Sequence, residues 1–569
     1  MSRILYRWGR AAARHPWRMI GVWLVIAVAV LGLDASVGGE TSDDWSIPGT
    51  EAQQGADVLE QSFPTEGGVA GRIVFADPDG DVTDATARAA IEQTLAAIED
   101  GPSVLSITDP FDPAQPAVSP DGRVAYATVR YSVDPPGPAE GEAALDAIEI
   151  ARDAGLQAEL SREVVRGVEE VEGKEAIGLA FAVIVLLVAF GSVIAAGIPI
   201  GSAIFGIFVG LGLVTVMASF TDVPSVSPLI ATMIGIGVGI DYALFVVTRH
   251  RAFLAEGKDP VESAALANAT AGTAVLFAGS TVVVALIGLV LAGIPSIATM
   301  GYASAITVAV AVAGAVTLLP AFLGIAGHRI DRWHIGRRRT GESGKPARHT
   351  LAGRWADHVG RHPWRYAIGS FVVLVAVAAP VLDMRTGLTD DGVAGEEHTY
   401  RHAYDLLAEG FGPGFNGPFT IAVDSHDGAQ LDSTQLATLQ QAVAGTDGVA
   451  FSGAPIVSPT GTTAVITAFP TTGPSDAATE ELVHTLRDEV IPDAVGNAEV
   501  DTYVTGQTAA FIDISEKLSA RLPIFIVAVV GVSFLLLMLV FRSVVVPFKA
   551  AIMNLLSIGA AYGVVVAVF

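Results

Sequence analysis

The residues with the clearest chemical potential are an aspartate and a tyrosine inside an apolar stretch. Asp241 and Tyr242 follow the run Ile234-Gly-Ile-Gly-Val-Gly-Ile240, and no cation lies beside them before Arg249. A carboxylate near the interior of a bilayer costs several kcal/mol unless it is protonated or partnered. Such residues mark proton or ion paths more often than packing positions, so we expect Asp241 and Tyr242 to form a proton relay.

Three glycines lie within one helical turn or two of this pair. Successive residues of a helix rotate by about 100°, so Gly237 and Asp241 share one face. Gly235, Gly239 and Tyr242 share the neighbouring face. Small residues let a partner helix approach closely, so we expect the glycines to pack at the relay and the carboxylate to be pressed against another helix. The alternative gives Asp241 a structural hydrogen bond inside the bundle and Tyr242 a packing role.

Composition places this pair in an integral membrane protein. Of 569 residues, 51% are hydrophobic and 16% are charged, with a mean hydropathy of +0.52. A helix needs about 20 apolar residues to cross a hydrocarbon core of about 30 Å. Nine stretches meet this condition, at residues 17–36, 175–196, 198–220, 227–248, 270–293, 299–326, 365–385, 520–541 and 547–569.

The sequence also excludes several classes of function. Cysteine is absent, and we expect no metal site and no cofactor. A net charge of -26 argues against nucleic acid as a partner. The chain has no Walker A loop, and no nucleophile elbow or zinc-protease motif, so we expect neither an ATPase nor another enzyme. An ion gradient remains as the source of energy.

Two short motifs recur and reveal an internal repeat. Arg14-His-Pro-Trp-Arg18 returns as Arg361-His-Pro-Trp-Arg365, and the Phe-x-Ser-Val motif at Phe190 returns at Phe541. The chain is therefore expected to hold two copies of one unit, with one span and a long polar segment opening each copy. The counterpart of Asp241 would fall near position 590, so we expect a chain truncated at its C-terminus, without its last three spans.

Lysine and arginine set the expected orientation. They gather before the first span, after the fourth span and in the central linker, which places all three regions in the cytoplasm. The protein is then a multi-pass protein of the cytoplasmic membrane with a cytoplasmic N-terminus. The predicted segments are 1–36 (basic N-terminus and first span), 37–172 (first extracytoplasmic domain), 173–327 (spans two to six), 328–364 (basic cytoplasmic linker), 365–386 (seventh span), 387–517 (second extracytoplasmic domain) and 518–569 (spans eight and nine).

Both long polar segments show the periodicity of the same fold. In the first, strands are expected at 72–76, 104–107, 124–132 and 156–160, with helices at 85–98 and 143–153. The second repeats the order β-α-β-β-α-β between residues 419 and 505. We therefore expect a polytopic α-helical membrane protein with two extracytoplasmic α+β domains of ferredoxin-like type and a two-fold internal repeat.

These motifs resemble those of one family of transporters. One span, an outer domain and five spans, with Gly-x-Gly-Ile-Asp241-Tyr242-Ala-Leu-Phe and the Phe-x-Ser motifs at Phe190 and Phe541, resemble the mycobacterial membrane protein large (MmpL) branch of the resistance-nodulation-division superfamily. The resemblance implies a twelve-span exporter of lipids or other amphiphiles, driven by the proton motive force. It also implies that Asp-Tyr pairs on the fourth and tenth spans face each other. Only the fourth-span pair maps onto this sequence, as Asp241 and Tyr242.

Two other functions remain open at this level. The same architecture serves a drug or small-molecule efflux pump, which differs only in cargo. A non-transporting scaffold would instead bind envelope-assembly proteins through its outer domains.

Overall fold

Two compact units make up the chain, each assembled from separate stretches of sequence. The computed structural model describes residues 2–568 except 40, 43–45, 64–68, 79, 114–116, 134–135, 170–173, 332–350, 385–386, 388–389, 426–427 and 497. A helical unit comprises Met1–Ser46, Lys174–Arg385 and Leu518–Phe569. A sheet unit comprises Ile47–Gly173 and Thr386–Lys517. Most of the predicted linker 328–364 lies outside the described residues.

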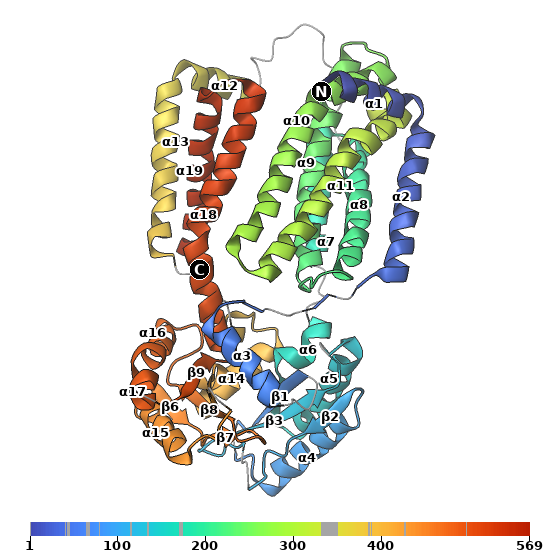
Figure 1. Ribbon diagram of the computed structural model, residues 1–569. Coiled ribbons are helices and arrows are strands. Elements are labelled where there is room, and N and C mark those ends of the chain that lie inside the picture. Colours follow the sequence, from blue (N-terminus) through green and yellow to red (C-terminus); the bar gives the residue numbers. More distant parts are fainter. Residues whose placement is uncertain are drawn as a thin grey trace. The chain divides into compact units, whose positions relative to one another are not determined.

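Long apolar helices form the helical unit (Figure 1). Within the described residues, eight helices are long and apolar enough to cross a membrane. They are α2 (Pro16–Val37), α8 (Val193–Ala218), α9 (Ser227–Ala255), α10 (Pro260–Ile287), α11 (Pro295–Ala326), α13 (Pro363–Ala378, extended by the 3-10 helix η4, Ala379–Asp383), α18 (Gln507–Phe541) and α19 (Val545–Val568). The sequence also predicted a span at 175–196. Helix α7 (Lys174–Phe190) lies there, and its apolar part is shorter than a full span. The chain is a multi-pass membrane protein.

Small residues let these helices pack closely. A Cβ on Gly210 of α8 would lie 3.1 Å from Thr307 of α11, and one on Gly563 of α19 would collide with the carbonyl of Val377 in α13. Glycine at such positions allows backbones to approach where larger residues would hold them apart. Helices α8, α9, α10 and α11 therefore form one packed bundle, and α13 and α19 lie side by side.

A left-handed residue joins the helices at both copies of the Phe-x-Ser motif. Between α7 and α8, Gly191 has a φ of +63°, and between α18 and α19, Arg542 has a φ of +47°. Ser192 then caps α8 by accepting a hydrogen bond from the amide of Ala195, and its hydroxyl donates to the carbonyl of Ile330 at 2.7 Å. Both motifs thus have a residue of positive φ at the same position, although only one has glycine there.

In the sheet unit, the first half folds as one sheet with two helices. The elements are β1 (Val69–Ala76), α4 (Ala85–Glu99), β2 (Val104–Ile107), β3 (Val124–Tyr131), α5 (Pro138–Asp153) and β4 (Gln157–Leu160), followed by α6 (Arg162–Glu169). The strands run in the order β2-β3-β1-β4, with every neighbouring pair antiparallel. Alternation along β1 sends Ile73 and Phe75 to the face that α4 and α5 cover.

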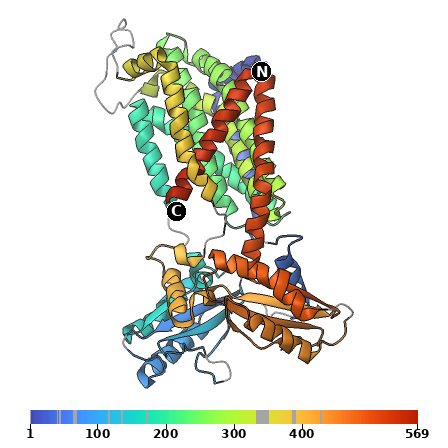
Figure 2. The ribbon, with the colours of Figure 1, turned by 90° about the vertical axis from the view of Figure 1, so that its left-hand side faces the viewer.

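The second half repeats this arrangement. Its elements are β5 (Phe419–Ser425), α15 (Ser433–Ala444), β6 (Val449–Ser452), β7 (Ile456–Val457), β8 (Thr463–Pro470), α16 (Ala477–Thr485), the π-helix η7 (Leu486–Val490), α17 (Ile491–Val495) and β9 (Val500–Thr505). The strand order is β6-β8-β5-β9, and β7 pairs with β8. Both sheets therefore have the same connectivity, and Figure 2 shows them side by side.

The two halves exchange one helix each. Helix α14 (Thr399–Phe411) of the second half covers the far face of the first sheet, where Leu406 and Leu407 pack against Val74. Helix α3 (Glu51–Ser62) of the first half lies on the second sheet, where a Cβ on Gly55 would be 2.8 Å from Tyr503 in β9. Each sheet is thus buried on both faces only when both halves are present.

Candidate functional site on α9

Asp241 is the central residue of the 29-residue helix α9. It lies about 21 Å from either helix end at a rise of 1.5 Å per residue. Its side chain is exposed, and it makes no hydrogen bond or ion pair within the part of the chain that the structure describes. A Cβ on Gly237, one turn earlier, would also meet nothing within 4 Å. Asp241 and Gly237 therefore lie on an open face.

The neighbouring face of α9 is closely packed. A Cβ on Gly235 would lie 2.7 Å from Thr307 of α11, and one on Gly239 would lie 3.0 Å from Ala203 of α8. Tyr242 is 6% exposed and belongs to the buried core of the bundle. Its ring lies 3.2 Å from the position that a Cβ on Gly279 of α10 would take. Three helices therefore fix the tyrosine.

Among the described residues no helix packs against Asp241, so the expectation that one does stays a prediction. Helices α8 and α11 pack on the face of Gly235 and Gly239, which is rotated from the face of the carboxylate by about 120–160° at 100° per residue. Spacing alone did not reveal which of the two faces is covered. In a bilayer, an ionised carboxylate on an open face costs several kcal/mol, so it is stable there only when protonated or covered by a polar partner.

Polar side chains elsewhere in the bundle are engaged without Asp241. Thr307 is fully buried and donates to the carbonyl of Ala303 at 3.1 Å. Thr281 donates to the carbonyl of Phe277 at 3.1 Å. Each hydroxyl bonds back to its own helix, which is the usual arrangement in an apolar span. Neither therefore pairs with the carboxylate.

Sequence reasoning missed two buried polar residues in the same bundle. His250 is completely buried near the end of α9, and neither ring nitrogen has a hydrogen-bond partner within the described residues. Nine residues separate it from Asp241, which is about 13.5 Å and half a turn around the helix. The two groups therefore do not form one hydrogen-bonded chain. Asn268 of α10, also buried, donates to the carbonyls of Leu5 and Val316.

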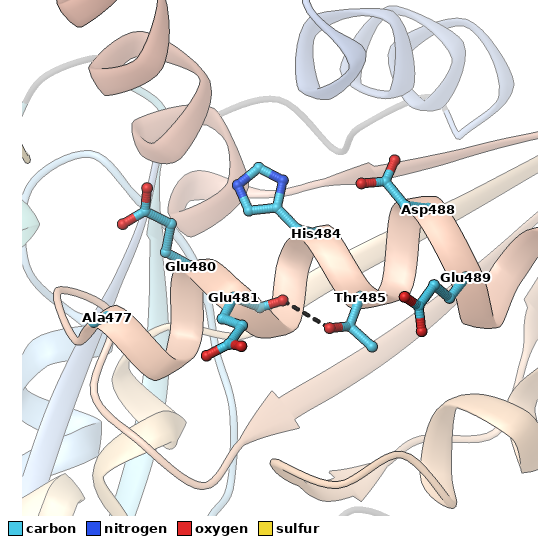
Figure 3. A pocket seen from close by; sticks show the side chains of 7 residues that line it. All are labelled: Ala477, Glu480, Glu481, His484, Thr485, Asp488 and Glu489. Atoms are coloured by element: carbon cyan, nitrogen blue, oxygen red, sulfur yellow. Dashed lines mark hydrogen bonds between the residues drawn. The ribbon is translucent and has the colours of Figure 1, made fainter.

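In the sheet unit, one group of side chains has the composition of a metal site. Ligand atoms of Glu480, His484 and Glu516 lie within 4.8 Å of one another, and a hollow of about 300 Å³ runs along α16 beside them. Figure 3 shows the acidic residues along that helix. His484 Nε2 lies 2.8 Å from a Glu516 oxygen, and both side chains are more than 40% exposed. This contact between exposed side chains accounts for the arrangement, and even as an ion pair, with His484 protonated, it adds only about 0–1 kcal/mol of stability.

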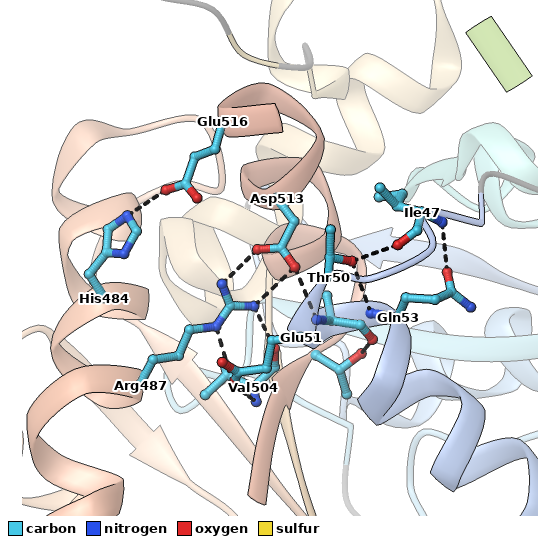
Figure 4. A network of polar contacts seen from close by, with 11 residues as sticks. Ile47, Thr50, Glu51, Gln53, His484, Arg487, Val504, Asp513 and Glu516 are labelled. Atoms are coloured by element: carbon cyan, nitrogen blue, oxygen red, sulfur yellow. Dashed lines mark hydrogen bonds and ion pairs between the residues drawn. The ribbon is translucent and has the colours of Figure 1, made fainter. Parts of the chain in front are cut away.

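One helical turn further along, a buried ion pair holds the exchanged helix α3 (Figure 4). Arg487 Nη1 donates to Asp513 Oδ1 at 2.6 Å, and their side chains are 10% and 5% exposed. The other Asp513 oxygen accepts the amide of Ala52 at 3.0 Å. Glu51 accepts the amide of Val504 at 2.7 Å and lies 3.3 Å from Arg487 Nε. The first turn of α3 is therefore fixed to α18 and β9 by charged groups.

Comparison with known proteins gives the chain a family. It is 39% identical to membrane protein YdfJ of Bacillus subtilis over the whole chain and 77% of that protein. It is 29% identical to the mycolic acid-containing lipids exporter MmpL11 of Mycolicibacterium smegmatis, over 98% of the chain and 60% of that protein. It is 28% identical to the heme uptake protein MmpL11 of Mycobacterium tuberculosis, over 99% of the chain and 60% of that protein.

The chain thus spans about three fifths of the length of the MmpL11 proteins and about three quarters of YdfJ. The model of the MMPL family matches residues 44–366 and 420–569, which cover both sheets and the membrane helices α8–α11, α18 and α19. The predicted relationship to MmpL transporters and their superfamily is confirmed. The chain belongs to the MMPL family.

Proposed function

We propose that this protein exports lipids or other amphiphiles across the cytoplasmic membrane and that the proton motive force drives it. The observation that carries the proposal is the position of Asp241, a carboxylate at the midpoint of an apolar helix and on its open face. The relay consists of Asp241 and Tyr242. Lipid transport within this family, as the name of the M. smegmatis relative states, supports the cargo class.

Protonation changes the energy of Asp241 enough to drive a conformational cycle. The neutral acid is tolerated in an apolar environment, whereas the ionised form costs several kcal/mol there. Each proton that crosses the membrane also gains about 2.3 kcal/mol per 100 mV of potential. Asp241 takes up a proton from one side of the membrane and releases it to the other. The neutral and the ionised carboxyl group therefore favour different packing arrangements on the open face of α9.

Tyr242 and the glycines give the relay a fixed frame. Tyr242 is held by its contacts in the bundle, and close packing at Gly235 and Gly239 holds the backbone of α9 against α8 and α11. A rigid frame confines the change on protonation to the Asp241 side of the helix.

Basic residues support a cytoplasmic N-terminus. Arg249 and Arg251 lie in the last third of α9. Helix α1 (Ser2–Arg14), which packs against the start of α10 and the end of α11, carries four arginines. In membrane proteins such clusters mark the cytoplasmic side. The sheet unit, whose sequence is acidic, is then extracytoplasmic.

Uptake of an amphiphile is a second candidate, because one relative is named for heme uptake. A drug as cargo would leave the mechanism unchanged. A transport assay distinguishes these cases from each other and from a scaffold. The protein is reconstituted into proteoliposomes with an imposed pH gradient, and movement of a fluorescent lipid, a dye and heme is followed in each direction.

Gradient-dependent movement of lipid toward the face that carries the sheet unit supports the proposal. Movement in the opposite direction would establish uptake instead. Cargo movement that an uncoupler leaves unchanged would refute the coupling to protons. Absence of movement for every cargo, with partner proteins still bound, would leave the scaffold as the function.

A further inference from the structure

Helix α1 forms a preformed surface at one end of the membrane bundle. Tyr6 donates to the carboxylate of Glu262 at 2.8 Å, near the start of α10. Asn268 donates to the carbonyl of Leu5 at 2.9 Å, and a Cβ on Gly9 would lie only 2.8 Å from that asparagine. At the other end of α1, a Cβ on Gly324 of α11 would lie 2.5 Å from the carbonyl of Ala13. These contacts fix which side of α1 faces outward.

The outward side carries a stripe of four arginines. Arg3, Arg7, Arg10 and Arg14 are spaced by four, three and four residues, which places them along one face of the helix. All four are exposed, and none forms an ion pair within the described part of the chain. Together with Tyr6 and His15 they line a hollow of about 700 Å³. In a chain of net charge -26, this is a concentration of unpaired positive charge.

Large apolar side chains border the stripe. Ile4 and Trp8 are 56% and 53% exposed, and Trp17, at the start of α2, is 75% exposed. Tryptophan is enriched where a protein meets the boundary between water and lipid. A basic face beside exposed aromatic and aliphatic residues is the pattern of a helix that lies in the membrane interface.

Part of this arrangement occurs a second time in the chain. Helix α12 (Leu351–Arg361) carries Arg354 and Arg361 at the positions equivalent to Arg7 and Arg14. Trp355 and Trp364, equivalent to Trp8 and Trp17, are 61% and 78% exposed. The second helix thus repeats the tryptophans and two of the four arginines, whereas Asp357 takes the position equivalent to Arg10.

We propose that the arginine stripe of α1 is a binding site for the phosphodiester headgroups of anionic phospholipids in the adjoining leaflet. Guanidinium groups bind phosphate oxygens through paired hydrogen bonds, and the exposed Ile4 and Trp8 contact the acyl chains. The lipid is a bound component of the interface and is distinct from any transported cargo. The site does not depend on the direction or energy source of transport.

Lipid retention measured by native mass spectrometry tests the site. The purified protein is equilibrated with equal amounts of phosphatidylglycerol and phosphatidylcholine, and bound lipids are counted for wild type and for the double variant Arg7→Gln/Arg10→Gln. The matched control is Arg88→Gln/Arg123→Gln, which removes two charges from the sheet unit. All four side chains are exposed, so equal melting temperatures are expected and are checked first.

Each arginine removed is expected to weaken phosphatidylglycerol binding about fivefold, which corresponds to about 1 kcal/mol. The control variant is expected to bind as wild type does. Wild type without a preference for phosphatidylglycerol, or equal retention by wild type and the α1 variant, would overturn the proposal. Displacement of the lipid by about 10 mM inorganic phosphate would also overturn it, because the site would then bind free phosphate and not a membrane lipid.

Discussion

Asp241 and Tyr242 are consecutive residues of α9 whose side chains lie in opposite environments. Tyr242 is buried at 6% exposure among α8–α11, whereas Asp241 is on the open face of the same helix. The rotation of about 100° per residue produces this division. The carboxyl group of Asp241 is thereby attached to a closely packed helix but lies on the face of that helix that the described residues leave open.

A change of glycine to leucine should affect the stability of the bundle differently on the two faces of α9. Gly235→Leu would drive a side chain into Thr307 and Ile207, so it should destabilise the bundle by about 1–3 kcal/mol. Gly237→Leu meets open space and should leave the melting temperature in detergent unchanged. Equal melting temperatures for the two variants would contradict the packing described for α9.

The ion pair of Arg487 and Asp513 should stabilise the sheet unit far more than an exposed pair does. Asp513→Ala removes the closer of the two carboxylate partners of a buried guanidinium, leaving Glu51, and should cost about 1.5–3 kcal/mol. Removing the exposed partner of Arg88 with Glu92→Ala should cost about 0–1 kcal/mol. Chemical denaturation monitored by circular dichroism gives both values. Similar values would mean that the network in Figure 4 does not hold α3 in place.

Asp391 predicts a pH dependence within the sheet unit. Burial raises the pKa of this carboxyl group, while the hydrogen bond and charge of Arg162, 2.5 Å away, act in the opposite direction. A raised pKa means that, at a pH between the pKa of the unfolded chain and that of the folded protein, the folded protein holds a proton that the unfolded chain has released. Stability from this group is therefore present at low pH and is lost as the pH rises from about 3.9, the ordinary value, through the raised value.

Asp391→Asn should remove that contribution. Across the same pH range, thermal unfolding of wild type should lose stability relative to the variant, and parallel curves would refute the assignment. The asparagine keeps the shape of the side chain and can still accept a hydrogen bond from Arg162, so it also serves as the steric control.

The repeated Phe-x-Ser motif predicts opposite effects of two substitutions. Arg542 adopts a φ of +47°, which costs an ordinary residue about 1–2 kcal/mol, so Arg542→Gly should stabilise the protein. Gly191→Ala should destabilise it, because Gly191 has a φ of +63° and open space around a Cβ leaves backbone strain as the main effect. Melting temperatures that move in the same direction for both would contradict the shared conformation.

The apolar periodicity of the sequence predicted the membrane helices and most elements of the two sheets. Strand β2 was expected at 104–107 and is Val104–Ile107, and helix α4 was expected at 85–98 and is Ala85–Glu99. Local patterns decide these elements, since each has one apolar face.

What the sequence did not predict depends on contacts between distant residues. Helices α3 and α14 were not assigned, because each buries its apolar face on the sheet of the other half. The network of Arg487, Asp513 and Glu51 joins residues more than 400 positions apart for the same reason. At the site, the spacing identified both faces of α9 but not which of them the bundle covers.

Proton movement coupled to transport tests the central role of Asp241 most directly. In proteoliposomes that contain a pH-sensitive dye, wild type should move protons in proportion to cargo, and Asp241→Asn should abolish both fluxes at unchanged expression and melting temperature. The conservative variant Asp241→Glu should retain coupled flux at a reduced rate. Full proton-coupled transport by Asp241→Asn would contradict the proposed relay.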